Sequence, residues 1–451
     1  MNDHFPRRIA FTATLLAVAL QPLAVAAVSS EEAARLKSEL TPMGAERGGN
    51  KDGSIPAWSG ALPAGNVPAG GRRPDPFAGD KPLYSVTADN VGSHAHKLTE
   101  GVRAMLERYP KTFRLDVYKT QRSAVAPQWV YDNTFKNATQ ARVEGTRIEG
   151  AYGGIPFPIP KSGVEAMWNH ALNWHGEAWR LDVRGVQITA DGKHVPTIQA
   201  AGNFQKPYYA RNGSLAAFNG THFLARVVNL GPPIRAGEGI VTRATLDPDK
   251  GQTWTYLPGQ RRVRKVPNAC CDTPMPTSAG VVMSDQVDVF AGRLDRFDWK
   301  LVGKKELLVP YNSNRSLVRP QAQALLAHHL NPDDVRWELH RVWVIDATVA
   351  AGQRHLAPKR RYYLDEDTWI ALLADHWDAK GQLWQTGFAI PVVMPDIPAT
   401  APPGLWGVYD LISGEGYVES VLNDAKEQFQ PVAPWPDTNF TPDALAGEGV
   451  R

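Results

Sequence analysis

The sequence predicts a mainly β (α+β) fold, in which a short helical N-terminal part precedes a long antiparallel β body. Three observations support this class. The chain contains 14 Trp, 13 Tyr and 14 Phe, residue types that are enriched in strands and in apolar pockets. From about residue 178 onward, apolar and polar residues alternate in segments divided by turns, as in half-buried strands. Most of these turns are too short for parallel crossovers, so neighbouring strands are expected to run antiparallel.

The composition is that of a globular protein. Of 451 residues, 43% are hydrophobic and 21% are charged, which argues against a disordered chain. The 39 Gly and 36 Pro exceed the usual share but stay below the level of low-complexity chains. The formal net charge of +3 is too small for a general nucleic-acid binder, so no nucleic-acid partner is expected.

Residues 1–26 have the pattern of a cleavable signal peptide. Arg7 and Arg8 precede an apolar run, and the small residues Ala24 and Ala26 stand at the expected cleavage point. The Arg pair also admits twin-arginine export. No other stretch approaches the about 18 apolar residues of a membrane span, and no Cys lies near the cleavage point. We therefore expect a soluble periplasmic protein without a lipid anchor.

Residues 27–82 are expected to form an N-terminal helix followed by a strap rich in Pro and Gly. Ser30 is the expected N-cap and Glu31 and Glu32 follow it, which predicts a helix that ends near Leu40. Residues 41–82 have the highest density of Gly and Pro in the chain. They fit an irregular strap or, alternatively, a disordered linker.

Residues 83–451 are expected to form a single large sheet domain with helices near residues 90–109, 129–141 and 162–170. The first helix is indicated by an apolar stripe that includes Leu98, Val102 and Met105 at three- and four-residue spacing. The third begins at a capping box made by Ser162 and Glu165.

Two strands carry charged residues among large apolar side chains. In residues 335–349, period two places Arg341 on the face of Trp337 and Trp343, and in residues 369–377 Asp375 shares a face with Leu373. A buried guanidinium needs a partner. Arg341 is therefore expected to pair with Asp375 or with another carboxylate. The alternative is that Arg341 holds the acidic head of an amphiphile whose tail lies on these aromatic faces.

Residues 253–257 and 261–266 read as a hairpin around Pro258 and Gly259. Its second strand carries a basic run, which can be a solvated edge that resists aggregation or a surface that meets anionic lipid or an acidic partner. The run consists of Arg261, Arg262, Arg264 and Lys265.

Standard catalytic and metal-binding signatures are absent from the sequence. There is no nucleophile elbow, zinc-protease helix, Walker loop or dinucleotide-binding loop, so no catalytic residue, metal or cofactor is predicted. The only cysteines, Cys270 and Cys271, are adjacent. In an oxidising compartment they can form a strained vicinal disulfide, remain free, or pair between molecules.

Several distinctive motifs occur together across the chain. They are Thr41-Pro42-Met43-Gly44-Ala45-Glu46-Arg47, Gly153-Gly154-Ile155-Pro156-Phe157-Pro158-Ile159-Pro160, Trp168-Asn169-His170, Pro310-Tyr311-Asn312 and Glu338-Leu339-His340-Arg341-Val342-Trp343. This set resembles the family catalogued as domain of unknown function 1329 (DUF1329), over essentially the whole mature chain. One departure is the segment from Cys270 to Pro274, where a Tyr or similar residue is expected before Asp272.

The resemblance implies a fold similar to the LolA/LolB-type outer-membrane lipoprotein-sorting carriers. In that fold a strongly curved antiparallel sheet, or half-open barrel, wraps around a few helices and encloses an apolar cavity. The resemblance also implies partners, namely an inner-membrane exporter of the resistance-nodulation-division (RND) class and an outer-membrane protein. It implies no catalytic residues, because none are established for the family.

These observations favour a periplasmic carrier or accessory protein for a lipid or other hydrophobic or amphiphilic molecule, linked to envelope lipid or lipoprotein trafficking or to an RND-type exporter. A non-catalytic scaffold of an exporter complex is the alternative, and it requires a filled interior with an exposed apolar patch. A periplasmic hydrolase with an unfamiliar site is the third hypothesis. The expected ligand-binding residues are Phe157, Ile159, Trp168, Trp254, Tyr256, Trp337, Arg341, Trp343, Leu373 and Asp375.

Overall fold

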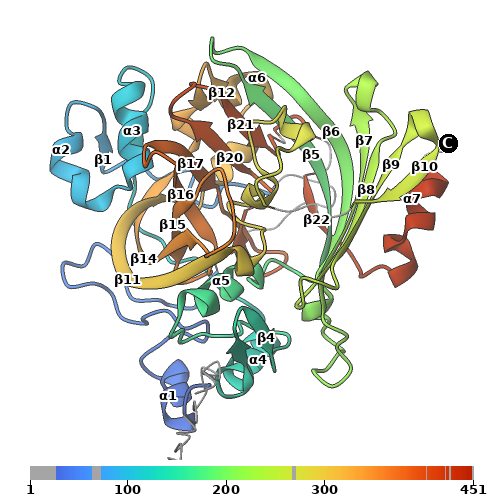
Figure 1. Ribbon diagram of the computed structural model, residues 1–451. Helices are drawn as coiled ribbons and strands as arrows, with labels where there is room; N and C mark the ends of the chain where they lie inside the picture. Colours follow the sequence, from blue (N-terminus) through green and yellow to red (C-terminus); the bar gives the residue numbers. More distant parts are fainter. Residues whose placement is uncertain are drawn as a thin grey trace, which may run out of the picture.

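One large sheet organises the chain (Figure 1). The computed structural model describes residues 27–62, 73–266, 271–402, 404–421, 423–425 and 428–448. In sheet order the strands are β1 (Tyr84–Val86), β2 (Leu115–Val117), β14 (Trp337–Val349), β15 (Lys359–Asp365), β16 (Ala371–Trp377), β17 (Leu383–Ala389), β20 (Trp406–Asp410), β21 (Gly416–Glu419), β5 (Ala178–Ile188), β6 (His194–Gln205), β7 (Thr221–Gly231), β8 (Gly239–Thr245), β9 (Gln252–Leu257) and β10 (Arg262–Lys265). Off this path, β11 (Phe297–Pro310) pairs with β14, and β22 (Phe429–Pro431) pairs with β5.

The pairing of this sheet is antiparallel with one exception. β2 and β14 run parallel where Val117 lies opposite Trp337. The strand order begins at β1 and ends at β10 without returning to its start, so the sheet is open and curved rather than a closed barrel (Figure 1). The prediction of a mainly β fold with a large curved sheet is therefore confirmed.

Three further two-stranded sheets complete the β structure of the described residues. They are β3 (Arg142–Glu144) with β4 (Arg147–Glu149), β12 (Leu325–Leu326) with β13 (His329–Leu330), and β18 (Val392–Met394) with β19 (Ala399–Ala401).

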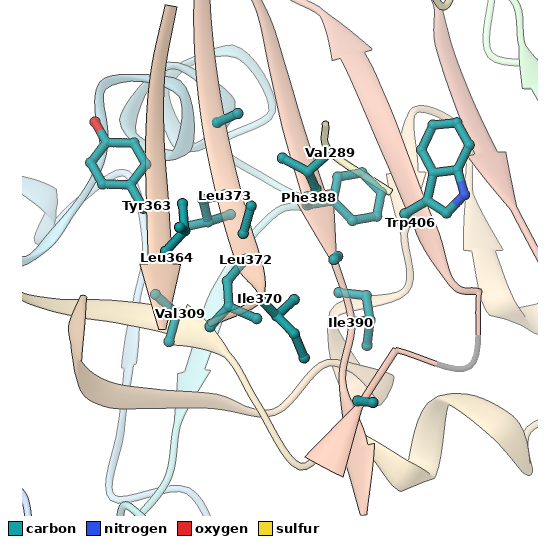
Figure 2. Close-up of a cluster of buried hydrophobic side chains, with 14 of the residues drawn as sticks. Val289, Val309, Tyr363, Leu364, Ile370, Leu372, Leu373, Phe388, Ile390 and Trp406 are labelled. Atoms are coloured by element: carbon teal, nitrogen blue, oxygen red, sulfur yellow. The ribbon is translucent and has the colours of Figure 1, made fainter. Parts of the chain in front are cut away.

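The main core lies between the strands β11 and β14–β17 and two helices that pack against them. The helix α5 (Gly163–Ala171) lies against β11 and β14, and α3 (Glu100–Arg108) lies against β16 and β17. Figure 2 shows part of this core, in which side chains of β15–β17 and β20 meet Val289 and Val309. Ile370 and Leu372 in this region are at most 2% exposed. This half of the sheet is called the packed half.

The strands β5–β10 form an arm on the right of Figure 1. One face of the arm packs on α7 (Pro442–Glu448) and on the residues just before it, through Leu224, Val241, Phe440 and Leu445. On the other face, Phe204, Phe223 and Val227 contact the main core. The arm therefore has an outer face under α7 and an inner face toward the packed half.

The helices follow the sequence with two differences. The helix α1 (Ser30–Ala34) is capped by Ser29, whose Oγ accepts a hydrogen bond from the amide of Glu32, rather than by Ser30. The helix expected near residues 90–109 is divided into α2 (Val91–His94), a 3₁₀ turn and α3, because Thr99 adopts an extended conformation and caps α3. The helices α4 (Gln128–Gln140) and α5 stand where they are expected, and α6 (Gln321–Ala324) is a single turn.

Residues 1–26, to which the signal peptide is assigned, lie outside the described residues. Within the part of the chain that the structure describes, none of the helices has the length and apolar character needed to cross a membrane.

Candidate binding surface

The inner face of the arm can be read from the strand register. Val227 lies opposite Ile240, Ile240 opposite Thr255, and Thr255 opposite Arg264. Residues directly opposite each other in antiparallel pairs share a face. The next row, which joins Phe204, Ala225 and Thr242, lies on the same face. These side chains, together with Phe223, are called the inner wall.

The inner wall is sealed at one end and open at the other. At the sealed end, the ring of Phe204 stacks on those of Trp179 and Phe223, with centroids 5.8 and 6.2 Å apart. Toward the β7–β8 turn the wall is less covered by other side chains. Val227 is only half-buried there, and Ile240 is 39% exposed. Aliphatic side chains on a sheet face are normally covered. At its open end the inner wall thus leaves part of Val227 and Ile240 in contact with solvent.

Two carboxyl groups in this part of the molecule have raised pKa values. Glu419 lies opposite Gly185 on the face of Trp179, and its carboxylate accepts hydrogen bonds from the Tyr417 hydroxyl (2.8 Å) and the Trp406 indole (3.2 Å). Burial raises the pKa of Glu419 to about 7. Burial also raises the pKa of Asp288 to about 6, although its side chain is exposed.

A buried lysine lies at the Phe204 end of the arm. Lys206 follows β6 directly, and its ammonium donates hydrogen bonds to the backbone oxygen (2.7 Å) and the Oδ1 atom (3.2 Å) of Asn173. Burial lowers the pKa of Lys206 to about 7, while the charge of Asp288 opposes this shift.

The ligand-binding residues expected from the sequence do not line one cavity. Trp254 and Tyr256 lie on the outer face of the arm with the cluster under α7. Trp168 donates a hydrogen bond from its indole to the backbone oxygen of Thr146. Phe157 and Ile159 meet at a cavity of about 10 Å³ beside Val28, Ala138 and Glu165.

Trp337 and Leu373 do come together, at a cavity between α3 and the sheet. Val102, Met105, Phe388 and Tyr409 are among the other residues that line it. Its volume is about 40 Å³, whereas pockets for small ligands measure about 300–1,000 Å³. This cavity is therefore too small for a lipid or another ligand of drug size.

Arg341 pairs with a carboxylate other than Asp375. Its guanidinium donates to Glu366 (2.9 Å) and to the backbone oxygen of Gly48 (2.9 Å). Asp375 instead accepts from the amide of Gly101 at the start of α3 and from the Tyr363 hydroxyl, both at 3.0 Å. The expected Arg341–Asp375 pair is wrong because each residue meets a closer partner from a distant segment. The pairing of Arg341 with another carboxylate is confirmed.

Arg341 belongs to a buried charged network that fastens the strap to the sheet. Arg122 grips both oxygens of Asp367 (2.9 and 2.7 Å) and donates to the backbone oxygen of Glu46 (2.8 Å). Lys304 joins the side chains of Glu46 (2.9 Å) and Glu366 (2.8 Å). Near it, Trp343 stacks on Trp369 with ring centroids 6.0 Å apart, and the Lys304 ammonium lies over the Trp343 ring.

Residues 365–367, at the end of β15 and before β16, supply three buried carboxylates. Ligand-type atoms of His340, Asp365 and Asp367 lie within 4.8 Å of one another. Although burial opposes it, hydrogen bonds to Asp365 and Glu338 raise the pKa of His340 to about 9. A protonated imidazole together with the Arg122 guanidinium balances these carboxylates. We therefore interpret the cluster as a structural ion network rather than a metal centre.

The basic run forms the outermost strand, β10, and Arg261 stands in the preceding turn. Arg262 and Arg264 lie on the inner face of the arm with Leu257 and Thr255, whereas Lys265 lies opposite Trp254 on the outer face. Cys270 lies outside the described residues, so the vicinal disulfide stays a prediction. Cys271 is buried.

Sequence reasoning missed Ile240, Asp288 and Glu419 as candidate site residues. A signal existed for Asp288, which stands between the apolar residues Val287 and Val289. For Ile240 there was no such signal, because the alternation along a strand does not show which face of the sheet is packed against other elements.

Comparisons with known proteins place the chain in a family. A family model described as "Protein of unknown function (DUF1329)" matches residues 85–446. The uncharacterized protein PA3922 of Pseudomonas aeruginosa is 39% identical over 442 residues, which cover 95% of each chain.

Two similar solved structures share 12% and 13% identity with this chain. A domain from Vibrio parahaemolyticus, titled as an outer membrane lipoprotein-sorting protein, overlaps with 63% of this chain and 98% of its own, at a TM-score of 0.43. A DUF1329 family protein from Desulfovibrio piger overlaps with 60% of this chain and 92% of its own, at a TM-score of 0.40. The extent of the family match and the identity to the Pseudomonas protein show that this chain belongs to the DUF1329 family.

Proposed function

We propose that this chain binds a hydrophobic or amphiphilic molecule on the inner wall and serves as a periplasmic carrier or accessory protein for it. The observation that carries the proposal is the incomplete cover of the wall, where Val227 is half-buried and Ile240 is 39% exposed. Burial of a ligand on such a surface is favourable by about 25 cal/mol for each Å² of apolar area removed from water.

Glu419, which shares a sheet face with Trp179 and interacts electrostatically with Asp288, favours a ligand with a polar head. With pKa values near 6 and 7, Asp288 and Glu419 can donate or accept hydrogen bonds at neutral pH. The wall consists of apolar side chains, two Thr and Arg264, and these supply contact area rather than a nucleophile with its base. The proposed role is accordingly non-enzymatic.

The proposed location and partners rest on other features. The signal-peptide pattern of residues 1–26 supports a periplasmic location. An RND-type exporter and an outer-membrane protein belong to the proposal as expected partners, and co-purification from the native envelope tests them.

Native mass spectrometry of the full chain after secretion, followed by organic extraction, tests for a bound amphiphile. Uptake of the fluorescent probe N-phenyl-1-naphthylamine tests the location of the site. Thr242→Asp places a charge in the middle of the inner wall and should weaken probe binding at least tenfold. Thr348→Asp is the matched control, since Thr348 is exposed on β14 between Asp298 and Lys359. Equal probe binding by both variants, together with no extractable amphiphile, would refute the proposal.

The scaffold hypothesis has an observation of its own. The packed half leaves a cavity of only about 40 Å³, and apolar side chains are exposed at the end of the arm, where Ile234 is 90% exposed. A ligand-free protein that co-purifies in fixed ratio with an inner-membrane exporter would favour the scaffold over the carrier.

A further inference from the structure

The end of the arm presents apolar side chains to solvent. The turn between β7 and β8 runs through Pro232 and Pro233 to Ile234, which is 90% exposed, and Leu230 at the end of β7 is 59% exposed. Most large aliphatic side chains in the described residues are covered by the core. Exposed aliphatic residues that gather at one tip mark an interaction surface rather than scattered surface residues.

A second turn lies beside the first. A Cβ placed on Gly237 would be 3.1 Å from Cγ of Pro258, so the β7–β8 turn touches the β9–β10 turn. Figure 1 shows both turns at the same end of the arm, at the upper right. Leu230, the β7–β8 turn, the β9–β10 turn and β10 are together called the arm tip.

The arm tip carries cations without partners. Arg261, Arg262, Arg264 and Lys265 form no ion pair with any residue that the structure describes. The charged groups of the first turn neutralise each other, because Arg235 pairs with Glu238 at 3.2 Å and donates to the backbone oxygen of Pro276. The tip therefore has about four excess positive charges next to its exposed apolar apex, by the sign of these side chains at neutral pH.

We propose that the arm tip docks on a membrane surface that contains anionic lipids. In this arrangement Ile234 and Leu230 enter the boundary between head groups and acyl chains, and the four cations contact lipid phosphates. Apolar insertion and electrostatic attraction act together in peripheral membrane binding, and each Lys or Arg near an anionic surface strengthens it about fivefold.

The shape of the tip favours a membrane over an acidic protein partner. Ile234 projects from a tight turn between Pro233 and Arg235, so a protein would need a matching pocket for it. A lipid surface deforms around a projecting side chain and needs no such pocket. Docking in this way would bring the open end of the inner wall to the membrane, because Ile240 and Arg264 lie on that wall near the tip.

Co-sedimentation of the full mature chain with vesicles tests the proposal. Vesicles of phosphatidylcholine with phosphatidylglycerol should bind the protein, and vesicles of phosphatidylcholine alone should bind it at least tenfold more weakly. Arg262→Gln combined with Arg264→Gln should weaken binding about 25-fold, at about fivefold for each charge. Ile234→Asp should weaken it tenfold or more. Added salt should weaken wild-type binding.

The matched controls make the same kinds of substitution at exposed positions outside the arm tip. Lys111→Gln combined with Lys380→Gln removes the same charge at exposed positions outside the arm, and Leu83→Asp changes an apolar side chain that is 65% exposed on the far side of the sheet order. Both controls should bind vesicles as wild type does. The wall variant Thr242→Asp should also bind vesicles, which separates docking from ligand uptake.

Failure of the wild-type protein to bind anionic vesicles overturns the proposal, and so does equal binding to neutral vesicles. Retained binding by either tip variant, with circular dichroism showing an intact fold, also overturns it, since the proposal requires both the cations and the apolar apex.

Discussion

The packed half and the arm use apolar surface and charge in different ways. In the packed half, Ile370 is 2% exposed and Arg122 holds both oxygens of Asp367. In the arm, Ile240 is 39% exposed and Arg262 and Arg264 have no ion pair among the described residues. Isoleucine and arginine side chains thus stabilise the fold in the packed half. In the arm, side chains of the same types remain exposed and can contact other molecules. This contrast locates the candidate function in the arm.

The largest effect is expected from breaking the buried network of the packed half. Arg122→Met leaves Asp367 buried without its partner and should lower the free energy of unfolding by about 3–5 kcal/mol. Arg262→Met, at an exposed position of the arm, should change it by less than about 0.5 kcal/mol. Urea unfolding followed by circular dichroism measures both. Similar changes in the free energy of unfolding for the two variants would contradict the claim that arginine is structural in the packed half and dispensable for stability in the arm.

A smaller effect is expected from a matched pair of isoleucines. Ile370→Ala creates a cavity in the core shown in Figure 2 and should cost about 2–5 kcal/mol. Ile240→Ala removes a side chain that is already partly hydrated, and should cost about 1 kcal/mol or less. The same variant should weaken binding of the apolar probe, whereas Ile370→Ala should not do so under conditions where it remains folded.

A third prediction concerns pH. Burial raises the pKa of Glu419 from 4.5 to about 7, so the folded protein keeps a proton that the unfolded chain releases. The stability of wild type relative to Glu419→Gln should therefore fall as pH rises from about 4.5 to about 7, and change little above that range. Urea unfolding at several pH values measures this difference, with Glu107→Gln on the exposed face of α3 as the control. A difference that does not depend on pH would show that Glu419 is not desolvated.

Local patterns predicted the elements well where the deciding interactions lie within a few residues. The hairpin around Pro258 forms, with β9 paired to β10, and Ser162 caps α5 through a hydrogen bond to the amide of Glu165. The helix near residues 90–109 was harder to predict, since its apolar stripe continues through Thr99 although the backbone leaves the helix there. Apolar residues can keep a spacing of three or four across a helix cap, so the spacing alone does not show that the helix is interrupted.

Partners distant in the chain were beyond prediction from one strand at a time. Period two predicted that Arg341 shares a face with Trp337 and Trp343, but its partners, the Glu366 carboxylate and the backbone oxygen of Gly48, come from the β15–β16 turn and the strap. The same holds for Trp254 and Tyr256, whose spacing says that they share a face but not that α7 covers it.

What the sequence determined by itself is therefore the β class, the antiparallel pairing and the positions of its main turns, because these follow from alternation and from backbone preferences over short distances. The tertiary structure decided which face of each strand is covered and which is left open. That choice depends on how segments hundreds of residues apart pack against the sheet, as α7 does on the outer face of the arm. The open inner wall, and with it the candidate function, results from packing and not from any single stretch of sequence.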